Sequence, residues 1–576
     1  MTDLPDIRDR ERFPGMVHWF KPGLLLKLLW NVIVSETFGQ YADRRLMIAA
    51  LDTPLPGEHM RRAMAHNFAK DHDGAVWIDF VADLGDGFDA TYAIASLLSA
   101  PTLAVDGHQL PRGQMLIMGG DEVYPAATSA AYKNQLRTPY ALALPDPAPH
   151  SDNGIPLYAI PGNHDWYDGL VMFLAFFCRE KPWHVGGWRS QQRRSYFAVK
   201  VTDSWWVWCI DIQLADDMDQ PQVDYFKGIA EKMPEKSKII LCGAEPGWLY
   251  TRTNPKPLRI VSYAAEIADN AHRDLTIPII LSGDTHHYSR YASEDGKQFI
   301  TSGGGGAFLH PTHQLENDIT VRWMREIDKK LSLTTDPQTG ARTTTEACYP
   351  TKTKSKRLLW GNLAFAATNW DFTILMGALY WLFAIGISLR PQWDAYVITY
   401  VVFAATLIGY TKYQEKSGNA AVYVSGAVHA LLHTVAVICL TSWFGELNAR
   451  HCPPSGQWYD IWLWLLILLV EIGIVGGIVG SFLFGLNLLV TCRWLKMNSN
   501  DAFSAMRLDS YRHFLRIKIK EDEVTIHAIG LDQVPSRADW QPNDTAPLFR
   551  PRHELKRHLI EEPIRVRPVR APTAGA

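Results

Sequence analysis

One short segment, Pro-Gly-Asn-His-Asp at residues 161–165, carries three side chains that could do chemistry together. Asn163 offers an amide oxygen to a hard metal ion, His164 can move protons near neutral pH, and Asp165 can fix the tautomer of an imidazole. The segment follows the apolar run at residues 157–160, which is typical of a buried strand that a Pro-Gly turn ends. We therefore expect the three side chains to leave the end of a strand together.

The same arrangement occurs at four other places in the chain. The apolar runs at residues 76–82, 115–119, 239–242 and 277–281 each lead into a glycine-flanked group of polar residues. These groups contain Asp83, Asp86, Asp121, Tyr124, Glu245, Asp284 and His286. Ligand sites in α/β proteins gather at the carboxyl ends of strands. Five strand ends that each carry Asp, Asn, Glu or His favour a metal site over five ordinary Asp- and Asn-rich turns.

These motifs resemble those of the calcineurin-like metallophosphoesterase superfamily. In chain order they are Asp-x-Gly (83–85), Gly-Asp-x-x-Tyr (120–124), Gly-Asn-His-Asp (162–165) and Gly-Asp-x-His (283–286). Gly85 and Tyr124 are similar to the variants in its purple acid phosphatase branch. The resemblance covers about residues 70–310, and Gly-Asn-His-Asp is its most specific part. It implies an α/β fold, a four-layer αββα sandwich, in which metal-activated water or hydroxide hydrolyses a phosphoester.

The resemblance also implies a set of ligands for two metal ions. The first ion would be held by Asp83, Asp121, Tyr124 and His286, and the second by Asn163, Glu245, Asp284 and the bridging Asp121. It implies His164 as general acid or oxyanion stabiliser, with Asp165 fixing its orientation.

This chain departs from the family where most relatives have histidine, at Glu245 and Asp284. An oxygen-rich second site favours Mn²⁺, Mg²⁺ or Fe²⁺ over softer metals, and the two ions are expected to be Mn, Fe, Mg or Zn. If Tyr124 coordinates as a phenolate, Fe³⁺ is the natural first metal; otherwise it supports a ligand without touching the ion. The assignment of Glu245 competes with other residues because Pro246 lies one residue nearer than expected, and Asp86 is an alternative ligand in its own loop.

Composition limits the class of protein. The chain has 576 residues and a net charge of −3, so no global field recruits nucleic acid. Seven cysteines without a Cys-x-x-Cys pair indicate free thiols in a reducing compartment, and the charged residues 1–12 are unlike a signal peptide.

The N-terminal segment, residues 1–70, contains the apolar run 24–34, which Lys27 interrupts and which is too short to span a bilayer. It either lies in the membrane interface as an amphipathic helix or packs on a domain. The metallophosphoesterase domain is expected at residues 71–345. Within it, residues 196–201 and 205–210 predict two strands of the second sheet, and the glycines at 303–306 predict close backbone packing beside the site rather than a P-loop.

A basic linker, residues 346–371, leads into a transmembrane region at residues 372–492 with about four helices. Of the apolar segments 372–389, 395–410, 422–444 and 461–492, the second is marginal in length and the others can span. Basic residues lie mainly on one side of these segments: Lys352, Lys354, Lys356, Arg357, Lys412, Lys416, Arg493 and Lys496, against Arg390 and Arg450 on the other. The positive-inside rule therefore predicts an integral protein of a cell membrane, such as the bacterial inner membrane, with both soluble ends in the cytoplasm.

Small residues at four-residue spacing, Gly473, Gly477 and Ser481 on one face and Gly476 and Gly480 on another, predict close helix packing, within the chain or in an oligomer. The intramembrane residues His429, His433 and Glu471 either hold a cofactor or pack against polar neighbours.

The C-terminal tail, residues 493–576, alternates apolar and polar residues at 514–519 and 524–529, which predicts a β-hairpin. Two strands alone are marginally stable, so the hairpin should pair with another part of the chain, such as the catalytic domain. The Arg- and Pro-rich end is expected to be disordered, either solvated or touching anionic lipid.

Two functions from different classes follow. The first is a membrane-anchored, dinuclear-metal phosphohydrolase that faces the cytoplasm; the intact Gly-Asn-His-Asp and His286 favour it. The second is a noncatalytic membrane sensor or scaffold that binds a phosphorylated ligand; the replaced histidines favour it. The substrate, whether a monoester, a diester or a lipid-linked phosphate, is not specified by any motif.

Overall fold

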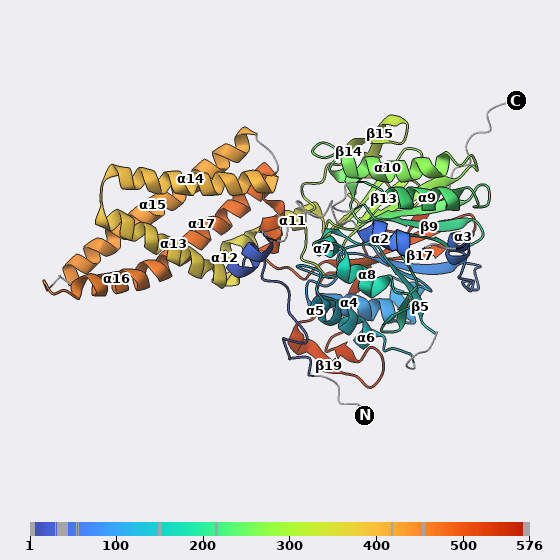
Figure 1. The fold of residues 1–576 in the computed structure, drawn as a ribbon, viewed down its shortest axis with the longest axis horizontal. Coiled ribbons are helices and arrows are strands. Elements are labelled where there is room, and N and C mark those ends of the chain that lie inside the picture. Colours follow the sequence, from blue (N-terminus) through green and yellow to red (C-terminus); the bar gives the residue numbers. More distant parts are fainter. Residues whose placement is uncertain are drawn as a thin grey trace. The chain divides into compact units, whose positions relative to one another are not determined.

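The computed structural model describes residues 6–28, 30, 44–52, 55, 57–147, 153–212, 217–415, 419–451 and 455–567. The chain divides into two compact units. The first unit comprises residues 1–17, 30–352 and 509–576, and the second comprises residues 18–29 and 353–508. Figure 1 follows both units along the chain by colour.

The first sheet of the first unit is built on three parallel strands, β1 (Val76–Val81), β4 (Leu116–Met118) and β5 (Ile155–Ala159). Within the described residues its order is β21 (Arg557–Leu559), β18 (Val524–Leu531), β17 (Arg512–Ile519), β1, β4, β5, β7 (Trp188–Ser190) and β6 (His184–Val185), with β22 (Ile564–Val566) also paired to β18. The ends of β1, β4 and β5 therefore lie at one edge of the sheet.

The second sheet has a parallel centre of β9 (Trp205–Ile210), β10 (Lys238–Gly243), β11 (Thr276–Ser282) and β13 (Gln298–Ser302). The antiparallel pair of β8 (Phe197–Lys200) with β9 confirms the two strands expected there. The remaining antiparallel strands are β12 (Tyr288–Ser293), β14 (Asp318–Trp323), β15 (Glu326–Ser332) and β16 (Cys348–Tyr349).

The two sheets pack face to face between helices, which is the αββα sandwich expected from the sequence. Side chains alternate along each strand, so Ile78 and Phe80 of β1 enter an inner core with Val207 and Ile240 of the second sheet. Outside the first sheet lie α4 (Phe88–Ser99), α6 (Thr138–Ala143) and α8 (Val171–Phe177); outside the second lie α9 (Gln220–Ala230) and α10 (Lys256–Asp269). Figure 1 shows α9 and α10 on one side of the strands and α4 and α6 on the other.

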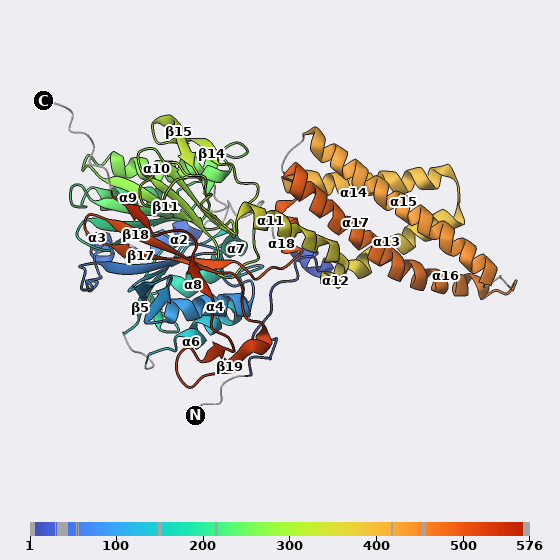
Figure 2. The ribbon, with the colours of Figure 1, turned by 180° about the vertical axis from the view of Figure 1, so that it is seen from behind.

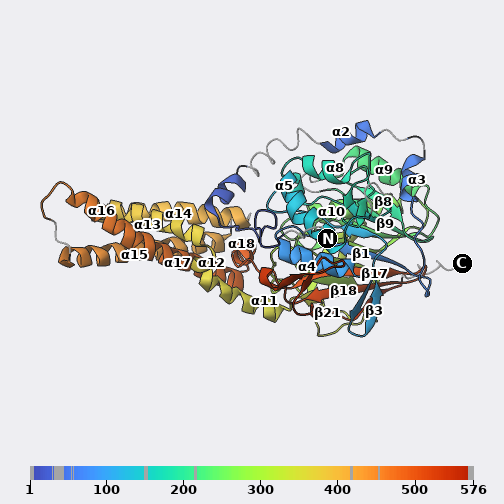
Figure 3. The same ribbon diagram turned by 90° about the horizontal axis from the view of Figure 1, so that it is seen from below.

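The C-terminal tail completes the first sheet rather than standing apart from it. β17 pairs antiparallel with β1, and β18 pairs with β17 (Figure 3). Arg516 of β17 forms a buried bidentate ion pair with Asp79 of β1, with Nε–Oδ1 at 2.7 Å and Nη2–Oδ2 at 3.0 Å. The expected hairpin is therefore present, and it pairs with the first sheet through β1, in the domain where a partner was expected.

The Arg- and Pro-rich end was expected to be disordered, and through residue 567 this expectation is wrong. Residues 540–566 contain β19 (Trp540–Pro542), β20 (Phe549–Pro551), β21 and β22. Two ion pairs, which the composition does not reveal, hold this part of the tail on the first unit. Glu561 pairs with buried Arg290, and Arg537, just before β19, pairs with Asp89. Residues 568–576 lie outside the described residues.

The second unit contains helices that are long and apolar enough to cross a membrane. Within the described part of the chain there are four, at Trp370–Leu389 (α13), Trp393–Glu415 (α14), Ala420–His451 (α15) and Asp460–Leu495 (α16 and α17 with their continuations). Figure 2 shows them in one helical unit. The second segment was expected to be marginal, but its helix extends to 23 residues because polar residues at both ends join it. Lys416, one of the basic residues used for orientation, lies outside the described residues.

The small-residue face of the fourth segment packs inside the chain. A Cβ on Gly377 of α13 would lie 2.1 Å from the carbonyl oxygen of Gly473, and one on Gly477 would lie 2.6 Å from that of Thr373. The two histidines of α15 contact polar neighbours, with His433 Nδ1 2.7 Å from the Tyr380 hydroxyl and its Nε2 3.0 Å from His429 Nε2. Glu471 accepts a hydrogen bond of 2.7 Å from Asn448.

The N-terminal apolar run is helical at residues 22–28. Just before it, Phe20 packs edge to face against Phe365, Phe372 and Phe484 of the second unit. Leu26 and Trp30 are exposed, and the end of the run, within residues 31–43, lies outside the described residues.

Candidate metal centre

Three of the expected ligands stand at strand ends in a left-handed backbone conformation. Asp83 follows β1 with φ 57°, Asp121 follows β4 with φ 53°, and Asp284 follows β11 with φ 65°. Residues other than glycine rarely adopt positive φ, and such conformations concentrate at functional sites. The same unusual turn at three strand ends indicates that the fold is built to direct these carboxylates.

Glycines let the loops approach the carboxylates closely. A Cβ on Gly162 would lie 2.0 Å from Asp121 Oδ1, and one on Gly303 would lie 2.2 Å from Asp83 Oδ2. These separations are shorter than any side chain tolerates. The close backbone packing expected for the glycine run at 303–306 is therefore present beside Asp83.

The inner part of the site gathers around the hydroxyl of Tyr124. This oxygen lies 3.1 Å from Asp83 Oδ1, 3.2 Å from Asp121 Oδ2 and 2.9 Å from His286 Nε2. All four side chains are buried. The four residues that the resemblance assigned to a first metal thus converge on one point.

The inner part of the site has more hydrogen-bond acceptors than hydrogen atoms to donate to them. His286 Nδ1 is 2.6 Å from the carbonyl oxygen of Phe308, so Nδ1 carries the ring proton and Nε2 presents a lone pair to Tyr124. The single hydroxyl proton of Tyr124 faces that lone pair and two carboxylates. Asp83 Oδ2 is buried and has no hydrogen-bond partner among the residues described. A cation is the group that such an arrangement accepts.

The electrostatics agree with this interpretation. Burial, followed by the charge of Asp284, raises the pKa of Asp83 well above its usual value, and burial with the charge of Asp83 does the same to Asp121. Carboxylates that destabilise one another in a buried site are stabilised by a positive ion. The donor chemistry fits a hard cation, although three or more His, Cys, Asp or Glu side chains are nowhere preassembled at metal-binding spacing in the described ranges.

The outer part of the site is more accessible. Asn163, Glu245 and Asp284 are each partly exposed. The Asp284 amide donates to Asp83 Oδ1 at 3.2 Å, and Tyr250 donates to Asp284 Oδ2 at 3.2 Å. Burial raises the pKa of Asp284 to about 6.

Asn163 and Glu245 approach this region from two other loops. Asn163 donates its Nδ2 to the Tyr167 hydroxyl at 3.0 Å, which leaves Oδ1 as its ligand atom. The loop that carries Glu245 lies against the loop of Asp121, because a Cβ on Gly120 would be 2.9 Å from Ala244 Cβ.

His164 is held differently from the expectation. Its Nδ1 lies 2.8 Å from the carbonyl oxygen of Pro125, and its backbone N–H donates to Asp121 Oδ1 at 2.8 Å. Burial lowers the pKa of His164 to about 4. The expectation that Asp165 orients this ring is wrong, because a backbone carbonyl takes that place.

Asp165 instead fixes the loop around the site. Its Oδ1 accepts a hydrogen bond of 2.5 Å from Tyr132, and its Oδ2 accepts from the amides of Gly162 and Glu122 at 3.0 and 3.2 Å. Burial raises the pKa of Asp165 to about 7. The carboxylate ties the loop after β5 to the loop after β4.

Several residues at the site were not expected from the sequence. Tyr132 and Tyr250 hold Asp165 and Asp284, and they come from helical or irregular segments without any motif. Glu122 is fully buried beside Asp121, and burial raises its pKa well above the usual value; its position next to Asp121 was the only available signal.

Asp86, the alternative ligand, accepts hydrogen bonds from the backbone amides of Val17 and Phe308 at 3.1 and 3.0 Å. These bonds give Asp86 a structural role.

Comparison with known families gives a match that begins at β1 and ends just after Asp284 and His286. The family model described as "Calcineurin-like phosphoesterase" matches residues 76–288. Residues 76–288 form a calcineurin-like phosphoesterase domain. The match includes every residue expected at the metal site, so the resemblance drawn from the motifs is confirmed for this domain.

Other comparisons add little about this phosphoesterase domain. No curated protein matches the chain. A solved structure titled "Structure of PhoD" is 9% identical, with a TM-score of 0.27, over 41% of this chain and 58% of that chain. The chain thus spans little more than half the length of that protein, and a similarity this low carries no argument about activity.

Proposed function

We propose that the chain is a membrane-anchored, metal-dependent hydrolase of phosphoesters. The observation that supports this most directly is the convergence of Asp83, Asp121 and His286 on the Tyr124 hydroxyl inside a phosphoesterase domain. The excess of acceptors there calls for a cation, and the partly exposed outer residues leave one side of the site open to a substrate.

Asp83, Asp121, Tyr124 and His286 would hold one ion; Asn163, Glu245 and Asp284 would hold a second, with Asp121 shared. The oxygen-rich donors favour Mn²⁺, Mg²⁺ or iron over Zn²⁺. When bound, such ions supply charge neutralisation for phosphoryl oxygens and a more acidic water.

His164 is placed to handle the proton of the leaving group. With Nδ1–H directed to the Pro125 carbonyl oxygen, we assign the exchange of the leaving-group proton to Nε2. Burial lowers the pKa of this ring to about 4, whereas the negative charge of a bound phosphoester raises it and so favours the imidazolium form. The protonated ring can then donate Nε2–H to the departing oxygen.

The strand pairing supports one feature of the membrane arrangement. β1 precedes the apolar helices and β17 follows them, yet the two are neighbours in one sheet. Both flanks must therefore lie on the same side of a membrane, which requires an even number of crossings. The four candidate helices in the described ranges meet that requirement, and the excess of Lys and Arg beside the soluble segments favours the cytoplasmic side.

A hydrolysis panel on the purified full chain tests the proposal. It compares a phosphomonoester, a phosphodiester and lipid phosphates, each with Mn²⁺, Mg²⁺, iron and Zn²⁺, beside the Asp121→Asn variant. We expect turnover of at least one class that requires a metal and Asp121. Binding of phosphorylated compounds without any turnover across the panel would instead support a noncatalytic sensor.

A further inference from the structure

Helix α2 (Arg44–Leu51) of the first unit turns a charged side toward its domain and an apolar side away from it. Positions 45, 48 and 52 share one side of a helix, and that side faces the domain. A helix on a water-soluble domain normally turns its apolar side inward and its charged side outward. Here the inward side carries Arg45 and Asp52, the residue that follows the helix, with only Ile48 between them.

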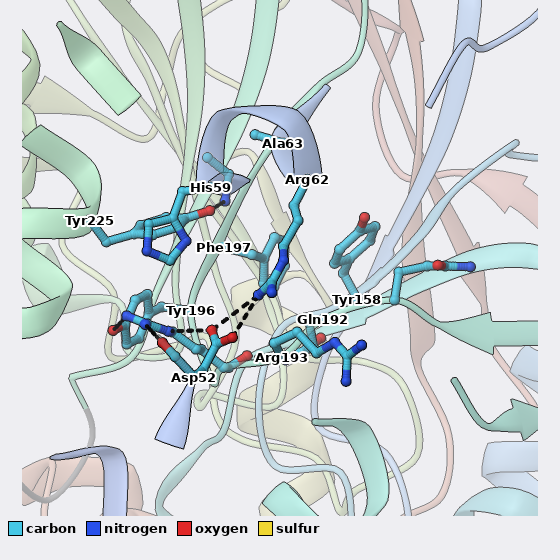
Figure 4. Close-up of a pocket in the computed structure, with 13 residues that line it drawn as sticks. Asp52, His59, Arg62, Ala63, Tyr158, Gln192, Arg193, Tyr196, Phe197 and Tyr225 are labelled. Atoms are coloured by element: carbon cyan, nitrogen blue, oxygen red, sulfur yellow. Dashed lines mark hydrogen bonds and ion pairs between the residues drawn. The ribbon is translucent and has the colours of Figure 1, made fainter. Parts of the chain in front are cut away.

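Charged contacts hold the inward side in place. Asp52 pairs with Arg62 at 2.9 Å and with Arg194 at 3.0 Å. In Figure 4 the carboxylate of Asp52 lies against Arg62, with His59 and Tyr225 nearby. The cavity beside them measures about 50 Å³, which is room for little more than a water molecule. This side of α2 is therefore an anchor and not a substrate pocket.

The outward side of α2 exposes large apolar side chains. Leu46 is 49% exposed, Met47 is 61% exposed and Leu51 is 80% exposed, and Leu55 beyond the helix is 70% exposed. Single exposed leucines need no explanation, but a continuous apolar helix face outside a soluble domain indicates a contact.

The anchored helix touches the metal-site loop. The Arg45 guanidinium lies 5.0 Å from the ring centre of Trp166, and its Nη1 donates to the carbonyl oxygen of Asp211 at 2.9 Å. Trp166 directly follows the Asn-His-Asp segment and donates its Nε1 to Asp211 Oδ1 at 3.1 Å. α2 is thus fixed to the loop that carries Asn163 and His164.

We propose that the outward face of α2, formed by Leu46, Met47 and Leu51, lies in the surface of a lipid bilayer beside the candidate site. A bilayer is the apolar partner that we expect for this face, because the same chain carries, among the described residues, four helices able to span one. The helical segment that precedes α2 also exposes apolar side chains, Leu26 at 70% and Trp30 at 67%. Both helices thus expose apolar side chains, as segments that lie in a membrane surface do.

The consequence concerns the class of substrate, and it rests on the proposed phosphoesterase activity. A site loop fixed to a helix in the bilayer surface meets phosphoesters that are themselves held in the bilayer. The structure therefore points to a lipid-borne phosphoester, taken from the membrane surface, rather than a small solute.

Paired kinetics test the substrate class. The Met47→Glu, Leu51→Glu double variant, reconstituted in vesicles, is compared with the wild type on a phosphatidate-type lipid phosphate and on a water-soluble aryl phosphate. Two charges on the inserted face should lower lipid turnover by about tenfold or more and leave soluble turnover unchanged. Ile327→Glu, at a side chain 69% exposed on β15, is the matched control and should change neither rate.

The outcomes separate the two proposals. No turnover of either substrate by the wild type contradicts the phosphoesterase activity itself. Wild-type turnover of both, with equal rates in the double variant, contradicts the role of α2 while leaving the activity intact. If the double variant, but not the control, loses turnover of both substrates, α2 serves the fold. That result also contradicts the role of α2 in lipid access.

Photocrosslinking identifies the occupant directly. A photoreactive amino acid at position 47 or 51, in the full chain in vesicles, should give lipid adducts by mass spectrometry, and position 327 should not. Adducts to residues 31–43, or to a second copy of the chain, in place of lipid would show that protein covers this face and would overturn the proposal.

Discussion

Removing Arg516 should unfold the phosphoesterase domain at lower temperature, although this residue lies beyond the four candidate membrane helices in sequence. Its guanidinium is fully buried and pairs with Asp79 through two hydrogen bonds of 2.7 and 3.0 Å. It also donates to the carbonyl oxygens of Leu110 and Leu98 at 3.2 and 3.4 Å. Arg516→Met keeps most of the volume and removes every one of these donors.

The cost follows from what is left behind. In the variant Asp79 remains buried, with the Gly113 amide at 3.1 Å as one remaining donor. Breaking a buried pair by removing one partner typically costs about 3–5 kcal/mol. Replacing both partners by apolar residues is often close to neutral, so Asp79→Leu combined with Arg516→Met should recover most of the loss.

Thermal unfolding of the detergent-purified protein, followed by tryptophan fluorescence, measures both variants. We expect the single variant to lose roughly 5 °C or more in Tm, and the double variant to lie between it and the wild type. If the single variant melts together with the wild type, the pair does not hold β17 in the sheet. If the double variant is worse than the single, the loss comes from packing and not from an unpaired charge.

Four further outcomes are expected. His164→Ala should lower turnover by about 10²- to 10⁴-fold with unchanged metal content, and wild-type turnover would exclude it as the proton donor. Asp121→Asn should lose one or both metals and activity by elemental analysis and assay, whereas Asp224→Asn, at an exposed position of α9, should lose neither; two retained metals would contradict the shared carboxylate. Burial lowers the pKa of His527 to about 4 from the usual 6.5, so the unfolded state binds more protons between these values and stability falls as pH drops from 6.5 towards 4, by up to about 3 kcal/mol. His527→Gln should therefore flatten the pH dependence of Tm in that range, and an unchanged slope would exclude this histidine. A reporter fused after Arg493, and one at the N-terminus, should both report a cytoplasmic location, and an external signal from either would overturn the topology.

Much of the site could be predicted because its chemistry is local in sequence. Each proposed ligand lies in the loop that follows an apolar strand, so the period of hydrophobic residues and the flanking glycines locate it without any knowledge of the tertiary fold. The convergence of Asp83, Asp121 and His286 then follows from parallel strands that end at one edge.

The predictions that were wrong concern contacts between residues that are distant in sequence. No local pattern distinguishes Asp165 as a partner of Tyr132 from Asp165 as a partner of His164, because the choice depends on where a separate helix packs. Similarly, the end of the tail has the composition of a disordered segment, but Glu561 within it pairs with buried Arg290 and accepts a hydrogen bond from Tyr288. The outward apolar face of α2 was also hidden, since the sequence does not say which side of a helix faces the domain.

The pairing of β1 with β17 imposes an order of events on synthesis. Asp79 and Arg516 are separated by 437 positions, and the four candidate membrane helices of the described residues are made between them. At about 5–20 residues per second, the ribosome reaches β17 roughly 20–90 seconds after β1. During that interval β1 has an open edge where β17 will lie, and an open edge is a template for aggregation. The sheet that positions Asp83 is thus completed only after the four apolar helices have been made, so a chain that stops within those helices also leaves its phosphoesterase domain incomplete.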